Sequence, residues 1–156
     1  MIVESTLDIG YLGSFLGARM NDVVRTRGAT QGFAGLRDSY GYVIQHLIDE
    51  DRTISELAAR MEISQQAVSK CVSEMARHRV VEYVSAKDKR VTIVRLSSRG
   101  WDAVRLARRT RKQLERRLQK AVGVRRYEDA QQVLATCLAV LGGVRRVRTR
   151  RIPLPR

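Results

Sequence analysis

The chain has 156 residues, of which 44% are hydrophobic and 29% charged. These values suit one folded domain, and they argue against a disordered chain and against a two-domain enzyme. The formal net charge of +14 calls for a polyanionic partner or an anionic surface, and residues 97–156 alone hold 17 basic and four acidic groups.

Several common features are missing from the sequence. No stretch approaches the roughly 20 apolar residues of a membrane-spanning helix, and residues 1–5 lack the basic start of a signal peptide, so we expect a cytoplasmic protein with no membrane partner. Cys71 and Cys137 lie far apart, as do His46 and His78, so no disulfide, metal site or cofactor is expected. Phosphate-binding glycine motifs and a G-x-S-x-G elbow are also missing, which argues against an enzyme.

The first third of the chain predicts two helices. Apolar residues recur at intervals of three and four from about Leu7 to Arg27, which predicts an amphipathic helix. Residues 28–35 contain three glycines and are predicted as a loop, and a second apolar period predicts a helix over 36–48.

Two short helices joined by a tight turn follow. Thr53 and Glu56 form a capping-box pattern that starts a helix over residues 54–61. Ser64 is a good N-cap for the next helix, which runs to about Arg79. The predicted inner face of that helix consists of Val68, Cys71, Val72 and Met75. This pair of helices is typical of a helix-turn-helix.

A β-hairpin and two further helices complete the expected fold. Residues 80–84 and 91–96 are rich in β-branched residues around a polar centre, which predicts a wing. Ser97 or Ser98 caps a long helix that ends near Gly123. A last apolar stripe runs over residues 127–141.

The expected fold class is therefore mainly α with a small β-hairpin wing, in one domain over residues 1–156. A winged helix-turn-helix lobe spans 36–98. The helices over 7–28 and 98–144 carry more apolar surface than this lobe can cover, so they are predicted to form a homodimer. Residues 145–156 are predicted as a basic flexible tail.

From Ile54 to Gly100 the sequence resembles the MarR family (multiple antibiotic resistance regulators). The clearest match is the family signature D-x-R-x-x-x-V-x-L-[TS]-x-x-G, formed by Asp88, Lys89, Arg90, Val94, Leu96, Ser97 and Gly100, and Glu56-Leu57-Ala58 matches the start of the family's helix-turn-helix. The resemblance implies a homodimer that places two winged lobes on one DNA duplex. It also implies a crevice that takes small aromatic acids.

One segment departs from the family pattern. Before the wing the family has L-E-x-x-G-x-V-x-R, whereas this chain has Met75, Ala76, Arg79, Val81 and Tyr83. Without glycine at position 79, the turn must either place a side chain at positive φ, at a steric cost, or be built differently.

The candidate DNA-binding residues lie on the second helix of the motif and on the wing. On the helix they are Ser64, Gln65, Gln66, Ser69, Lys70 and Ser73, whose polar groups suit base edges and phosphates. On the wing they are Lys87, Asp88, Lys89 and Arg90, where Asp88 would hold a neighbouring arginine in place. The alternatives are an ordinary polar helix face and a solvated charged turn.

A candidate site for a small aromatic or anionic ligand consists of Phe15, Arg19, Tyr40 and His46, although Phe15 and Tyr40 also suit a core and Arg19 a solvated position. The arginines of the long helix either face solvent or support contacts with phosphates. The leading hypothesis is a dimeric, sequence-specific regulator of transcription, a repressor acting on a pseudo-palindromic operator in double-stranded DNA. The alternative is a sequence-indifferent architectural protein that binds nucleic acid.

Overall fold

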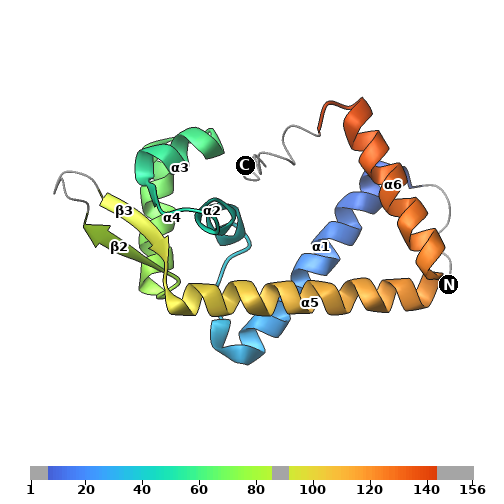
Figure 1. The fold of residues 1–156 in the computed structure, drawn as a ribbon, viewed down its shortest axis with the longest axis horizontal. Helices are drawn as coiled ribbons and strands as arrows, with labels where there is room; N and C mark the ends of the chain where they lie inside the picture. Colours follow the sequence, from blue (N-terminus) through green and yellow to red (C-terminus); the bar gives the residue numbers. More distant parts are fainter. Residues whose placement is uncertain (1–6, 86–91, 144–156) are drawn as a thin grey trace.

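The structure, a computed structural model, describes residues 7–85 and 92–143. It is mainly helical with one small antiparallel sheet, which confirms the predicted fold class (Figure 1). The helices are α1 (Ile9–Gly28), the π-helical turn η1 (Ala29–Phe33), α2 (Tyr40–Leu47), α3 (Ile54–Met61), α4 (Gln65–Arg77), α5 (Ser98–Val122) and α6 (Val124–Val140). The strands are β1 (Arg52–Thr53), β2 (Val81–Ser85) and β3 (Thr92–Leu96).

The elements fall into two groups along α5. In Figure 1, α2, α3, α4 and the strands gather at the start of α5, whereas α6 turns back from its far end and α1 crosses it. We call the first group, residues 40–96, the lobe. α1 packs on α5, and α6 packs on the far part of α5 after a reversal at Gly123, which has a φ of 87°.

The connection between α1 and α2 differs from the predicted loop over residues 28–35. The helix runs to Gly28, and the amide of Ala29 still donates to the carbonyl groups of Arg25 and Thr26. The helical backbone then widens into η1 and becomes irregular at Gln31, with a φ of −107°, and at Gly32, with a φ of 85°. Glycine can adopt helical backbone, as Gly28 does, so the prediction of a loop from residue 28 was wrong for residues 28–30.

The start of α2 also differs from its prediction. Residues 37–39 form a turn, in which the Tyr40 amide donates to the Arg37 carbonyl at 3.0 Å, so the helix begins at Tyr40 instead of 36. The apolar period did predict burial correctly at Leu36, which packs against the core although it lies before the helix.

The lobe contains the hydrophobic core. Its fully buried side chains are Leu57, Met75, Val43, Val68, Val72, Val80 and Val94. The sheet order is β1-β3-β2, with Val81 opposite Leu96 and Arg52 opposite Val94. The predicted hairpin is therefore confirmed, and β1 adds a two-residue edge strand that was not predicted, because two residues carry no readable period.

The end of α4 is joined closely to the start of α5. Arg79 adopts a φ of 57°, so the turn places a non-glycine residue in the left-handed region, one of the two outcomes expected there. The Ser97 amide donates to the Val80 carbonyl at 3.1 Å, and its hydroxyl donates to the Arg79 carbonyl at 2.6 Å. The same hydroxyl caps α5 by accepting from the Gly100 amide at 3.0 Å.

Arg99 ties this junction to η1. Its Nε donates to the His78 carbonyl at 3.1 Å and its Nη2 to the Gly32 carbonyl at 2.6 Å. The guanidinium also lies over the Phe33 ring, 4.7 Å from its centroid, which adds a cation–π contact. One side chain therefore connects the end of α4, the break after α1 and the first turn of α5.

The helices outside the lobe bury little. Neither α1 nor α6 contains a buried residue, although both carry large apolar side chains. The exposed ones on these two helices are Ile9, Tyr11, Leu12, Phe15, Leu16, Val23, Val124, Val133, Leu134, Leu138 and Val140. A surface of this size is rare on a protein that remains a monomer.

We predict that Gly100→Ala lowers the free energy of unfolding by about 3 kcal/mol, because overpacking against a backbone atom has little room to relax. An added Cβ would lie 2.1 Å from the Val80 carbonyl oxygen. The control is Gly41→Ala in α2, where nothing lies within 4 Å of the new Cβ, and which should stabilise by about 0.5–1 kcal/mol. Urea unfolding followed by circular dichroism measures both, and equal stabilities would contradict this account of the junction.

Candidate nucleic-acid interface

α3 and α4 form the predicted helix-turn-helix. The Thr53 hydroxyl accepts from the Glu56 amide at 3.2 Å, and the Glu56 carboxylate accepts from the Thr53 amide at 2.8 Å, so the capping box is confirmed. The hydrogen bonds that the Thr53 amide and, at 2.9 Å, the Thr53 hydroxyl donate to the Glu56 carboxylate lower the pKa of Glu56. The turn closes at Glu62, where φ is 57° and the Ile63 amide donates to the Ala58 carbonyl at 3.2 Å.

α4 presents one polar face to solvent. Val68, Val72 and Met75 are fully buried, as predicted for the inner face. The outward residues Ser64, Gln65, Gln66, Ser69, Lys70 and Ser73 are all exposed. Because the buried stripe fixes the rotation of the helix, the side chains of both glutamines and of Lys70 face solvent.

Two of these side chains also make hydrogen-bond contacts with other residues of the protein. The Ser64 hydroxyl accepts from the Ala67 amide at 3.2 Å and caps α4. The Ser73 hydroxyl lies 3.4 Å from the Tyr83 hydroxyl. Tyr83 is 48% exposed, and its hydroxyl reaches the polar face of α4 from β2.

Two exposed residues of the wing strands, Tyr83 and Arg95, were not selected from the sequence as candidate site residues. Arg95 on β3 pairs with Glu82 on β2 at 2.7 Å, in agreement with their opposite positions in the register. The only sequence signal for Tyr83 was its place where the family pattern has arginine. The predicted wing-tip residues Lys87, Asp88, Lys89 and Arg90 lie outside the described residues.

A group of polar side chains lies behind α4. Arg37 pairs with Glu74 at 2.9 Å, and the Tyr40 hydroxyl donates to Glu74 at 3.4 Å. Burial, followed by the charge of Glu74, raises the pKa of Tyr40. Cys71 packs against the core, and this burial raises the pKa of its thiol. The reactive thiolate form is therefore disfavoured.

The four residues predicted to bind a small ligand lie in two different surroundings. Phe15 is 61% exposed on α1, stacked on Tyr11, and Arg19 pairs with Asp22 nearby. Tyr40 and His46 are buried in the lobe. One pair is therefore on an open helix, whereas the other contributes to the core.

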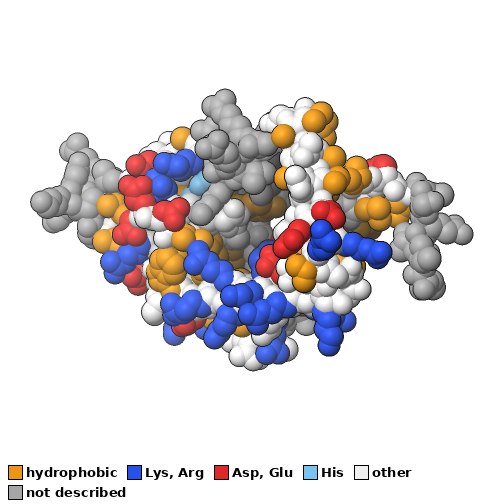
Figure 2. Space-filling model, turned by 45° about the vertical axis from the view of Figure 1, so that its right-hand side comes forward, with side chains coloured by type: hydrophobic (Ala, Val, Ile, Leu, Met, Phe, Trp, Pro, Cys, Tyr) orange, Lys and Arg blue, Asp and Glu red, His pale blue; other side chains and the backbone are white. Residues whose placement is uncertain are grey.

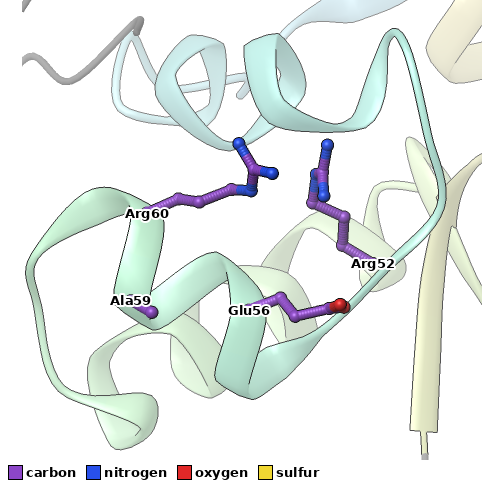
Figure 3. A pocket seen from close by; sticks show the side chains of 4 residues that line it. All are labelled: Arg52, Glu56, Ala59 and Arg60. Carbon is purple, nitrogen blue, oxygen red and sulfur yellow. The ribbon is translucent and has the colours of Figure 1, made fainter.

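A shallow pocket opens beside α3, with a volume of about 330 Å³. Arg52, Glu56, Ala59 and Arg60 line it, and the two guanidinium groups point toward the same space (Figure 3). Arg52 is already held by the His46 carbonyl at 2.8 Å and by Glu50 at 2.9 Å. The carboxylates of Glu50 and Glu56 balance the two positive charges, so the pocket has no strong preference for an anion.

The described residues also limit other kinds of site. In residues 7–85 and 92–143, no three or more His, Cys, Asp or Glu side chains come together as a metal site. None of the helices in these ranges combines the length and apolar character needed to cross a membrane.

The helix-turn-helix, the hairpin and the flanking helices define a winged helix-turn-helix protein. Residues 34–91 match the model of the MarR family, whose members are DNA-binding regulators of transcription. This match covers most of the lobe and the residues just before it, and the similar solved structures share the fold over most of the chain. No curated protein sequence matches it significantly.

Three solved structures illustrate the similarity in fold. YusO from Bacillus subtilis has 19% identity and a TM-score of 0.68, over 85% of this chain and 93% of its own. The reduced form of MarR from E. coli has 15% identity and a TM-score of 0.69, over 86% and 99%. A mutant of MepR from S. aureus, bound to an oligodeoxyribonucleotide, has 17% identity and a TM-score of 0.58, over 86% and 99%.

The cap at Ser64 yields a prediction about stability. Ser64→Ala leaves a backbone amide of α4 without its partner and should lower the free energy of unfolding by about 1 kcal/mol. Ser64→Thr keeps a hydroxyl and should recover most of this loss. The matched control is Ser69→Ala, also exposed on α4, which should change stability by less than about 0.5 kcal/mol. If thermal unfolding shows Ser64→Ala and Ser69→Ala to be equally stable, the cap contributes nothing.

Proposed function

We propose that this protein is a homodimeric, sequence-specific DNA-binding regulator of transcription, and a repressor of a pseudo-palindromic operator. The observation that supports this most directly is the exposed polar face of α4, held outward by a fully buried stripe. Gln and Ser side chains on such a face suit base edges in the major groove. The MepR structure with a bound oligodeoxyribonucleotide belongs to a protein of the same fold.

The homodimer is supported by the apolar surface of α1 and α6, which has nothing to cover it within the described chain. A two-fold pair would bury this surface and direct two lobes to one side. Because α4 of both protomers must reach the same face of the duplex, the half-site centres should lie about 10 base pairs apart.

Four further parts of the proposal depend on the sequence. The protein is a binding protein and not an enzyme, and it acts in the cytoplasm. A small aromatic or anionic ligand releases it from DNA, and in a dimer the open site at Phe15 and Arg19 is where a second chain would provide the remaining wall. The wing residues Lys87, Lys89 and Arg90 contact the backbone or the minor groove.

The second candidate is a sequence-indifferent architectural protein, which the high positive charge favours. Such a protein needs phosphate contacts but no base-reading face. The uncharged side chains Gln65, Gln66, Ser69 and Ser73 on α4 contribute little to backbone attraction, and they favour the regulator.

The dimer is tested by placing a charge on its proposed interface. Phe15→Glu should convert the protein to monomers at micromolar concentration, because a buried unpaired carboxylate is costly. Thr26→Glu adds the same charge at an exposed polar position of α1 and should remain a dimer. Sedimentation velocity measures both, and a parent protein that is monomeric would contradict the proposal.

Base reading is tested with one glutamine on α4 and one elsewhere. Selection from a random duplex library should enrich a two-fold symmetric sequence, and failure to enrich one would favour the architectural alternative. On that sequence, Gln66→Ala should cost about 1–3 kcal/mol of binding free energy, with little change on random DNA and no change in salt slope. Gln113→Ala, also at an exposed position of a helix, should bind both duplexes like the parent. An equal loss for Gln66→Ala on both duplexes would contradict base reading by this face.

A further inference from the structure

The exposed side of α5 carries a continuous row of positive charges. Arg105, Arg109, Lys112, Arg116 and Lys120 are all exposed. Their intervals of four, three, four and four residues place them on one face of a helix. From residue 105 to residue 120 the row is about 22 Å long, because each of the 15 steps between them rises by about 1.5 Å. We call these five residues the α5 stripe.

The opposite side of the helix explains this orientation. Val104 and Thr110 are buried, Leu106, Leu114 and Leu118 are half-buried, and α5 packs against α1 and α6. Packing therefore fixes the rotation of α5 and directs the stripe to solvent. Figure 2 shows Lys and Arg side chains gathered over the lower part of the molecule, where Figure 1 places α5.

Acidic side chains do not neutralise the stripe. Between Ser98 and Val122 there are nine basic residues and two acidic ones. Asp102 pairs with Arg105 at 2.7 Å at one end of the row. Within the described chain, Arg109, Lys112, Arg116 and Lys120 form no ion pair.

The spacing is unfavourable for the isolated helix. The pairs 105–109, 108–112, 112–116 and 116–120 each place two positive charges four residues apart, an arrangement that destabilises a helix. A solvated helix face gains stability from opposite charges at this interval, and this face has the reverse. The repulsion is relieved when a polyanion binds along the row.

We propose that the α5 stripe is a second DNA-binding surface, which contacts the phosphates of a duplex without reading its sequence. This inference rests on the proposed function in one respect, namely that the polyanion is DNA. Duplex DNA presents one negative charge per about 1.7 Å of its axis, so it matches a straight row of this length. The row contains no aromatic residue to stack on unpaired bases and no bulky apolar residue to enter a membrane.

The test neutralises the centre of the stripe in the full chain. The variant Arg109→Gln/Lys112→Gln/Arg116→Gln removes like-charged neighbours, so its melting temperature should equal or exceed that of the parent. Fluorescence anisotropy with a random 30-base-pair duplex, over a series of salt concentrations, should show weaker binding. The slope of log affinity against log salt should become shallower by about two to three units, at about 0.9 per lost phosphate contact.

The control separates the position of the charges from their number. Arg27→Gln/Arg125→Gln/Arg126→Gln changes the net charge equally at exposed positions on α1 and α6, and it should keep the parent's salt slope. Equal losses in both triple variants would overturn the proposal, because total charge would explain them. A stripe variant with the parent's affinity and slope would also overturn it. A stripe variant that keeps duplex binding but loses binding to polyglutamate or to phosphatidylserine vesicles would also overturn the proposal, because the stripe would then serve a different polyanion.

The outcome is distinguishable from failure of the proposed function. The stripe variant should lose affinity for the selected sequence and for random DNA by the same factor, whereas Gln66→Ala should lose affinity for the selected sequence alone. Loss of the Gln66 effect with a retained stripe effect would contradict the sequence-specific regulator and support the stripe. The reverse result would contradict the stripe alone.

Discussion

The junction between the end of α4 and the start of α5 is the constraint on which the structure depends. The carbonyl groups of residues 78–80 accept hydrogen bonds from Ser97 and Arg99, and Gly100 admits the Val80 carbonyl at a distance no side chain allows. Fully buried Val80 lies at the same point. The orientations of α4 and α5 are therefore set by one group of backbone contacts.

Most of the fold could be predicted from local sequence signals. Ser64, Ser97, Thr53 and Gly123 each mark a helix end through a short-range hydrogen bond or a backbone preference, and these need no knowledge of the rest of the chain. Other features depend on distant contacts. β1 exists because Arg52 and Thr53 pair with β3, 40 residues later, and a strand of two residues has no pattern of its own.

The candidate site divides in the same way. The outward face of α4 follows from the period of its buried residues, so its polar residues could be selected from the sequence. Tyr83 could not, because its place beside Ser73 depends on how β2 returns along α4. Phe15 and Tyr40 look equivalent as aromatic residues on amphipathic helices, and only the structure separates an exposed ring from a buried one.

The length of α5 has a mechanical consequence. Its 25 residues make a rod of about 37 Å that is fixed to the lobe at one end and packs on α6 at the other. A rotation of about 5° at the junction moves the far end by about 3 Å, as follows from that length. By the same geometry, a shift of about 3 Å at the α6 end of a rigid α5 would correspond to a change of only about 5° in the angle of the lobe.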